Sequence, residues 1–479
     1  MKVAMSNFLL QQKPYLQKII QELLTDFPYV SILATDVTGT IYETQLTETK
    51  VADSGWTERG FVVRIHNGFN YSEFSFNQIP ENPDQAGKIG EDIRLGLKKS
   101  LEDLKNKAIP KNKYPIIEEK AENLSWQADV AIAPEETEPK QIIARLMDLK
   151  TRAQQQSALL IDMQVIFEQV QVSKIFLSAK KDLAQAYIWS QGYLIPIVRR
   201  EDNTKYTYQS FSGLKGVELI RDMEAGLNAA VTEAESLLDA GRVEPGEYDV
   251  ICSPSVAGLI AHEAFGHGVE MDMFVKKRAK ATEYLGKPIA SELVSMHDGA
   301  RAAQQVSSYF FDDEGTLGKD TLIIDKGILK NGISDLLSAF QLQTTPTGNG
   351  KRESYERKAY SRMTNTFFAK GRDTIADMIA SISFGYLLEK FASGMEDPRN
   401  WGIQCMIHYA REIKEGRLTG KLVSPVILTG YVPDLLKSVS MVSGDEIRLS
   451  GSGACGKGYK ERVKVSAGGP YIKTKARLG

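Results

Sequence analysis

The chain has 479 residues, of which 42% are apolar and 25% charged, and its 59 basic and 61 acidic side chains leave a net charge of −2. These values are typical of a globular protein, and the length suggests two to three domains at roughly 100–200 residues each. The even charge balance gives no electrostatic reason to expect nucleic-acid or membrane-surface binding. Three cysteines in a chain of this length exclude a disulfide scaffold.

The N-terminal segment lacks a basic stretch followed by a long apolar core, so we expect no signal peptide. No apolar run approaches the roughly 18–20 residues that span a bilayer. We therefore expect a cytoplasmic protein with reduced thiols and no membrane partner.

The first half of the chain predicts helices around a block of strands. Short β-rich runs between residues 29 and 78 predict antiparallel hairpins, one of them turning at residues 67–70. Further strands are expected between 158 and 208, and residues 108–140 lack periodicity and predict an exposed connection. Apolar periodicity predicts four helices, over residues 9–25, 84–107, 140–157 and 216–240.

Gly241 and Pro245-Gly246 interrupt the chain after the last of these helices. We predict two domains, an N-terminal domain over residues 1–225 with an antiparallel sheet and helices, and a C-terminal domain over residues 226–479. The second domain is expected to be mostly antiparallel strand and turn, with helices near 254–266 and 373–391. The fold class is α+β, because helices and strands do not alternate as βαβ units.

The expected helix at 254–266 carries the most informative motif, His262-Glu263-Ala-Phe-Gly266-His267. Ser253 and Pro254 are typical of a helix N-cap and first position. The motif is H-E-x-x-x-H, one residue longer than the H-E-x-x-H of zinc metalloproteases. Residues four apart on an α-helix differ by about 40°, whereas residues five apart differ by about 140°. The two histidines can therefore share a metal only if the helix is irregular between them, and Gly266 favours such a distortion.

Two histidines do not complete a catalytic zinc site, which usually has three protein ligands and one open position. The best third candidate is Cys455, because glycines on both sides would let its loop approach a metal closely. A free cysteine in a glycine-rich turn is the alternative interpretation. Cys405 and His408 form a C-x-x-H, but the segment predicts a strand, where residues three apart face opposite sides.

These pieces resemble the TldD/PmbA family of metallopeptidases, specifically its metal-bearing TldD branch. The matching segments are HEAFGHGVEMD (262–272), DDEGT (312–316), RMTNT (362–366) and the turn around Cys455. The resemblance implies that His262, His267 and Cys455 bind one Zn²⁺ per chain and that Glu263 is the catalytic carboxylate. It also implies action on unfolded or extended peptides, and assembly as a homodimer or as a heterodimer with a PmbA/TldE-like chain.

Other residues of these motifs can serve either the site or only the fold. Glu270 and Asp272 can orient a ligand imidazole or form a solvated acidic turn. Arg362 and Asn365 can bind substrate or belong to a structural turn. The acidic DDEG segment lacks the ligand spacing of a calcium loop and predicts a hairpin turn.

The sequence therefore predicts a zinc peptidase in which Glu263 accepts the proton of the attacking water. Two alternatives remain open. One is a metal-dependent hydrolase of small amides, and the other is a non-catalytic assembly or regulatory subunit with a structural metal.

Overall fold

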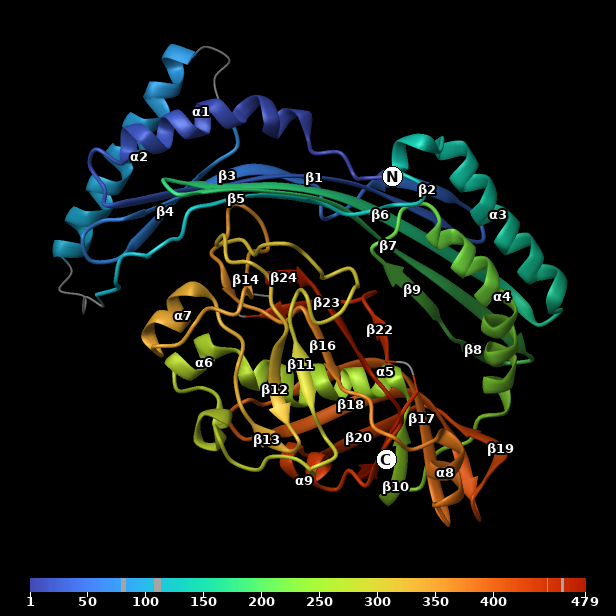
Figure 1. Cartoon of the computed structure of the whole chain (residues 1–479). Helices are drawn as coiled ribbons and strands as arrows, with labels where there is room; N and C mark the ends of the chain where they lie inside the picture. The colour runs from blue at the N-terminus through green and yellow to red at the C-terminus, as the bar shows by residue number, and fades with distance from the viewer. Residues whose placement is uncertain (79–82, 107–112, 446, 458–460) are drawn as a thin grey trace.

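The computed structural model describes residues 1–78, 83–106, 113–445, 447–457 and 461–479. It is a mixed α+β structure, as expected, with a long curved sheet as one layer and a strand-rich C-terminal half beneath it (Figure 1). Within the described residues, no helix combines the length and the apolar character needed to cross a membrane.

The long sheet has nine strands, in the order β4-β3-β1-β6-β7-β5, with β2 beside β1 and with β8 and β9 beside β7. Its pairings are antiparallel except that between β5 and β7. The strands are β1 (Tyr29–Thr44), β2 (Thr49–Asp53), β3 (Glu58–His66), β4 (Tyr71–Phe76), β5 (Glu122–Gln127), β6 (Leu160–Ser178), β7 (Lys181–Arg200), β8 (Asn203–Tyr206) and β9 (Gln209–Gly213).

Alternate residues of β6 face different layers, because successive side chains of a strand point to opposite faces. Phe167 and Ile175 pack toward the helices, whereas Val172 and Phe176 pack toward the C-terminal half. The four predicted helices lie close to their expected positions, as α1 (Asn7–Leu23), α2 (Pro83–Asn106), α3 (Pro139–Gln156) and α4 (Leu219–Ser236). The sheet is thus covered on both faces.

In the C-terminal half, five strands form a closed ring, because β10, β17, β18, β20 and β26 each pair with two others of the set. A six-stranded sheet in the order β13-β12-β11-β16-β25-β22 lies beside the ring. The hairpins β14–β15 and β23–β24 pair only within themselves among the described strands.

The strands of this half are β10 (Gly246–Cys252), β11 (Met296–Asp298), β12 (Thr321–Asp325), β13 (Ile328–Leu329), β14 (Gly350–Lys351), β15 (Tyr360–Ser361), β16 (Asn365–Phe368), β17 (Phe384–Glu396), β18 (Gly402–Lys414), β19 (Arg417–Val423), β20 (Val426–Tyr431), β21 (Met441–Val442), β22 (Arg448–Ser450), β23 (Ala454–Lys457), β24 (Glu461–Lys464), β25 (Ser466–Gly469) and β26 (Ile472–Leu478). Its α-helices are α5 (Pro254–Leu259), α6 (Met271–Val275), α7 (Leu336–Gln341), α8 (Ile375–Ala380) and α9 (Val432–Lys437).

Helix α5 lies between the ring and the six-stranded sheet, and it contacts β17 on one side and β25 on the other. The contact with β25 depends on glycine, because a Cβ at Gly258 would lie 2.5 Å from the backbone nitrogen of Gly468. This close approach buries the helix in the largest apolar core of the protein.

Two segments have a different secondary structure from the one predicted. The helix expected over 373–391 is limited to α8, because the chain from Phe384 onward forms β17 and pairs with the ring strands β10 and β18. Tertiary pairing here overrides the local helical pattern. The expected exposed connection over 108–140 contains β5, which lies at the sheet edge beside β7; residues 107–112 of that segment lie outside the described residues.

The predicted boundary between residues 1–225 and 226–479 falls inside helix α4. That helix packs against β7 of the long sheet, and the next strand, β10, belongs to the ring. The division into two domains at this point stays a prediction.

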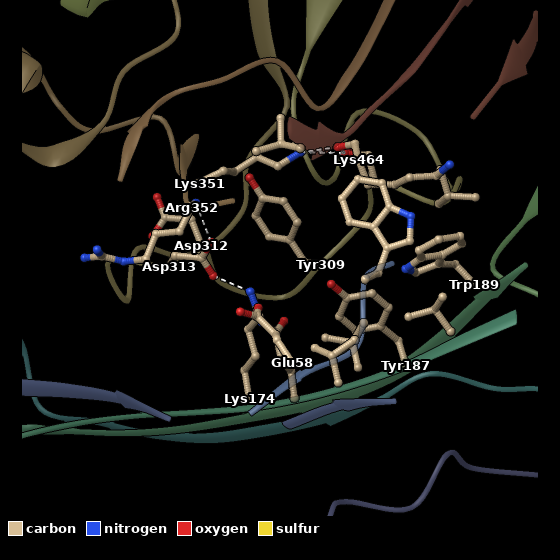
Figure 2. Close-up of a pocket in the computed structure, with 18 of the residues that line it drawn as sticks. Glu58, Lys174, Tyr187, Trp189, Tyr309, Asp312, Asp313, Lys351, Arg352 and Lys464 are labelled. Carbon is tan, nitrogen blue, oxygen red and sulfur yellow. Dashed lines mark hydrogen bonds and ion pairs between the residues drawn. The ribbon is translucent and has the colours of Figure 1, made fainter. Parts of the chain in front are cut away.

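The DDEGT segment joins the two layers. It forms the expected tight turn, with Phe311 and Leu317 bridged, but the turn is buried against the long sheet. The Asp313 carboxylate lies 2.5 Å from Lys174 Nζ (Figure 2). Glu314 Oε1 lies 2.7 Å from Arg64 Nη2. Asp313 and Glu314 thus each meet a basic partner that projects from the sheet, whereas the Asp312 carboxylate accepts hydrogen bonds from backbone amides.

Candidate metal centre

The helix that carries the H-E-x-x-x-H motif begins as expected. Ser253 is the N-cap residue in an extended conformation and Pro254 occupies the first turn. The Ser253 hydroxyl makes no capping hydrogen bond, so its position rather than its side chain marks the helix start.

The predicted irregularity between the histidines is confirmed. Residues Ile260–Gly266 form a π-helix, and the His267 amide donates to the carbonyl of His262, five residues earlier. This wider turn brings the two imidazoles together edge to face, with ring centroids 5.2 Å apart. Gly266 leaves room inside the turn, because a Cβ there would lie 2.2 Å from Met363 Sδ and would displace that buried side chain.

Cys455 joins the two histidines from the distant strand β23. Ligand atoms of the three side chains lie within 4.8 Å of one another, and Cys455 Sγ lies 3.3 Å from His267 Nε2. They are the one group of His, Cys, Asp and Glu side chains within the described ranges that is placed to hold a metal. All three side chains are buried or half-buried.

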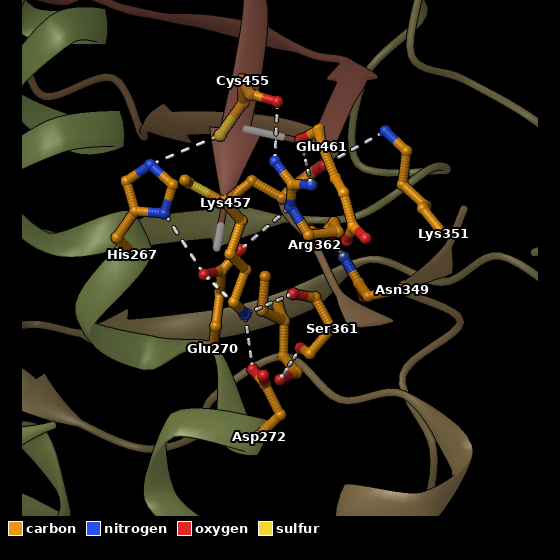
Figure 3. A network of polar contacts seen from close by, with 12 residues as sticks. His267, Glu270, Asp272, Asn349, Lys351, Ser361, Arg362, Cys455, Lys457 and Glu461 are labelled. Atoms are coloured by element: carbon orange, nitrogen blue, oxygen red, sulfur yellow. Dashed lines mark hydrogen bonds and ion pairs between the residues drawn. The ribbon is translucent and has the colours of Figure 1, made fainter. Parts of the chain in front are cut away.

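Glu270 fixes the orientation of His267. Its Oε2 lies 3.2 Å from His267 Nδ1 (Figure 3). Because a carboxylate only accepts hydrogen bonds, Nδ1 carries a proton, and Nε2 is the ring nitrogen that faces Cys455. The expected role of Glu270 as an orienting group is thus met by geometry, whereas Asp272 contacts Lys457 and Lys276 instead of an imidazole.

The half-buried Lys457 and the buried Arg362 both lie beside the Glu270 carboxylate. Lys457 Nζ lies 3.0 Å from Glu270 Oε2 and 2.6 Å from Asp272 Oδ1. Arg362 Nε lies 3.6 Å from the other oxygen of Glu270. Burial alone would raise the pKa of Glu270, but Lys457 and His267 outweigh it and hold that pKa well below its usual range. The carboxylate therefore stays charged while it holds the imidazole.

The cluster also shifts the pKa values of the ligand side chains. Burial would raise the pKa of the Cys455 thiol, but the neighbouring imidazoles outweigh it and hold that pKa well below the ordinary value. Burial would lower the pKa of His267, but Cys455 and Glu270 raise it well above the ordinary value. The imidazoles therefore favour the thiolate form of the sulfur, which is the form that binds metals.

Glu263 lies on the same π-helical turn and faces open space. It lines a cavity of about 720 Å³ together with His267, Lys457 and Gly394. Burial raises the pKa of the half-buried carboxyl, although His262 and His267 oppose the shift. Strand β17 passes close by, because a Cβ at Gly394 would lie 2.6 Å from Glu263 Cγ. The carboxylate is thus held beside the cluster and open to a ligand in the cavity.

Arg362 and Asn365, the two candidates for substrate binding or a structural turn, are both buried. Arg362 is 1% exposed and donates hydrogen bonds to the backbone carbonyls of Cys455 and Glu461. Asn365 is fully buried, and its amide donates to the carbonyl of Gly299. Neither side chain lines the cavity beside Glu263. Their burial therefore does not support direct contact with substrate, which stays a prediction.

Sequence reasoning missed Lys457 and Gly394. A signal for Lys457 was present, because residues two apart on a strand share a face and Lys457 follows Cys455 by two positions. Gly394 gave no such signal, since its closeness to Glu263 depends on how the ring packs against the helix. Cys405 and His408 of β18 have different surroundings: Cys405 is buried, and His408 Nε2 lies 3.1 Å from the carbonyl oxygen of Tyr206.

Comparison with known proteins shows that the chain is similar to metallopeptidases. The family model for the PmbA/TldA metallopeptidase C-terminal domain matches residues 245–476. A metalloprotease TldD homologue of Buchnera aphidicola is 34% identical over 48% of this chain and 47% of its own length. A zinc metalloprotease TldD homologue of Saccharolobus solfataricus is 33% identical over 48% of this chain and 51% of its own. The matched region thus has the sequence of a metallopeptidase domain.

The fold agrees over nearly the whole chain. The crystal structure of TldE from Thermococcus kodakarensis matches with a TM-score of 0.75 and 16% identity, over 97% of this chain and all of that one. By sequence, the chain spans about half the length of the first curated relatives it matches. Through its C-terminal half, the chain belongs to the TldD/PmbA metallopeptidase family.

Proposed function

We propose that this chain is a zinc-dependent peptidase that hydrolyses unfolded or extended peptides, with His262, His267 and Cys455 as the ligands of one zinc ion per chain. The observation that carries the proposal is the convergence of three donor atoms beside the carboxylate of Glu263 at an open cavity. The metalloprotease names of the relatives support the same activity.

The donor set fits zinc. Two imidazoles and a thiolate are the nitrogen and sulfur ligands that zinc prefers in proteins. His262 Nδ1 is buried without a hydrogen-bond partner among the described residues, a costly state for a polar atom that makes no other bond. Three protein ligands would leave a coordination position for water, as in catalytic zinc sites.

The chain's own residues have defined tasks in this proposal. Bound zinc would polarise the scissile carbonyl and lower the pKa of its water to about 7. Glu263 accepts the proton of the attacking water on its carboxylate and delivers it to the leaving amine. The raised pKa of Glu263 suits a group that must hold a proton between these two transfers. Glu270 keeps His267 in one orientation throughout.

The substrate and the assembly are part of the proposal. A cavity of about 720 Å³ has room for several residues of an extended peptide. We propose a dimer, either of two such chains or with a PmbA/TldE-like partner; the likeness of this fold to a TldE structure makes a related partner reasonable.

An experiment separates this function from its alternatives. Purified protein is depleted of metal with a chelator, reloaded with zinc, and assayed on an unfolded polypeptide and on small amides. Zinc-restored cleavage of the polypeptide is expected. Cleavage of the small amides alone would favour the amide hydrolase, and a zinc-loaded protein that cleaves neither would favour a structural metal.

A further inference from the structure

Resting on the metal site proposed above, we infer that Arg362 is a positioning residue that fixes the thiol of Cys455 against the two imidazoles. Nothing in its motif distinguishes this role from substrate binding. The argument comes from the contacts of its guanidinium group.

The guanidinium bridges both strands of the hairpin that carries the thiol. Arg362 Nη2 donates to the carbonyl of Cys455 on β23 at 2.7 Å, and Nη1 donates to the carbonyl of Glu461 on β24 at 3.1 Å (Figure 3). Among the described strands, β23 and β24 pair only with each other. No sheet ladder among the described strands therefore ties this hairpin to the histidine-bearing helix, so the contacts of Arg362 add a direct link between them.

The same guanidinium also reaches the histidine side of the cluster. Its Nε lies 3.6 Å from Glu270 Oε1, an ion-pair distance, while Glu270 Oε2 lies 3.2 Å from His267 Nδ1. One side chain thus connects the backbone at the thiol ligand with the carboxylate that orients an imidazole ligand. These ligands are 188 positions apart in the sequence.

Arg362 is itself rigidly held. Its amide donates to the carbonyl of Asn349, and the Asn349 side chain donates back to the carbonyl of Arg362 at 3.0 Å. The side-chain amide of Asn349 also donates to the buried carboxylate of Asp298 at 2.7 Å. Because these hydrogen bonds fix the Arg362 backbone, its planar guanidinium defines where the carbonyls of Cys455 and Glu461 lie.

Positioning and charge neutralisation predict different outcomes for lysine at this site. An ammonium group keeps the positive charge near Glu270 but cannot offer the fixed fork that binds two carbonyls and faces a carboxylate. If Arg362 only neutralises Glu270, R362K retains the metal site. If it positions Cys455, R362K loosens the thiol although the charge is kept.

The experiment compares full-length wild type, R362K and the matched control R64K. Arg64 is also buried and is paired with Glu314 and Glu73, away from the cluster. Zinc affinity is measured by competition with a chromogenic chelator, and the cobalt-loaded proteins are scanned for the thiolate-to-cobalt charge-transfer band. Urea unfolding reports the stability of each variant.

We expect R362K to bind zinc about 10–100-fold more weakly, the range typical when a residue behind a ligand is altered, and to weaken the charge-transfer band. R64K should lose stability but keep the affinity and the band of the wild type. If R362K does not fold, R362Q, which keeps an amide donor but no fork, is measured in the same way. Wild-type affinity and band in a folded Arg362 variant would overturn the inference, whereas a wild type that binds no zinc would instead overturn the proposed function.

Discussion

Two buried polar clusters lie in the C-terminal half, and they differ in what balances them. In the turn at Asp313 and Glu314, each carboxylate faces a lysine or arginine from the long sheet. In the cluster of His262, His267 and Cys455, two imidazoles and a thiol face one another. The two carboxylates of the first cluster are neutralised by cations of the protein. The second cluster instead brings three possible metal-ligand atoms within 4.8 Å of one another.

This difference separates a structural contact from a candidate reactive site. The carboxylates of Asp313 and Glu314 are paired within the protein, so this turn holds the long sheet against the C-terminal half. The donor cluster is supported from behind by Glu270, which is itself held by Lys457. Support of this kind is what metal ligands require. Mutations in the acidic turn should therefore change stability, whereas mutations around the donor cluster should change catalysis or zinc binding.

The largest effect is expected at Glu263. E263Q keeps the size of the side chain but cannot accept the proton, so peptide hydrolysis should fall by about 10²–10⁴-fold, the usual contribution of a general base. Zinc content should stay at the wild-type value. Steady-state kinetics and metal analysis check both, with E292Q, at an exposed glutamate in the same half, as the control. Activity near that of the wild type would remove Glu263 from the mechanism.

Removing Lys174 should affect only the structural cluster. K174M leaves the Asp313 carboxylate buried without its partner, and breaking a buried pair in this way costs about 3–5 kcal/mol of unfolding free energy. Zinc bound per folded chain should not change. Urea unfolding measures the loss, and D148N, at an exposed pair with Arg152, should cost less than about 0.5 kcal/mol. Equal losses in the two variants would show that the turn is not a structural contact.

A methyl group at Gly394 should disturb catalysis without disturbing the metal. In G394A the added Cβ would lie 2.6 Å from Glu263 Cγ and so displace the carboxylate. A misplacement of about 1 Å can cost up to 10²-fold in rate, so we expect kcat to fall about 10–100-fold at unchanged zinc content. The matched control is G402A, because a Cβ at Gly402 meets no atom within 4 Å. Unchanged kcat in G394A would mean that Glu263 does not depend on this contact.

Zinc affinity should rise with pH. Without metal, Cys455 and Glu270 outweigh the burial of His267 and raise its pKa well above the ordinary value, so its imidazole is protonated at neutral pH. Zinc must displace that proton, and each displaced proton gives about a tenfold change in affinity per pH unit. Chelator competition at pH 6, 7 and 8 measures this slope. A flat profile would contradict the described coupling between His267 and Cys455.

Local patterns predicted much of the fold and of the candidate site. The four N-terminal helices follow from apolar periodicity, and the π-helical turn follows from the five-residue spacing of His262 and His267. The pairing of Cys455 with these histidines rested on its glycine-rich setting and on the family resemblance.

Long-range packing accounts for what could not be predicted. Strand β17 reads locally as a helix and becomes a strand through its pairing with β10 and β18. The burial of Arg362 and its contacts with two hairpin carbonyls depend on segments about a hundred residues away. A single sequence carries no signal for such contacts.

The central claim is that two imidazoles and one thiolate bind a single metal. X-ray absorption spectroscopy of the zinc-loaded protein tests it most directly, with C455S measured beside the wild type. We predict one zinc per chain, with one sulfur at about 2.3 Å and two imidazole nitrogens at about 2.0–2.1 Å, and loss of the sulfur signal in C455S. A wild-type protein without stoichiometric zinc, or a zinc shell without sulfur, would contradict the account.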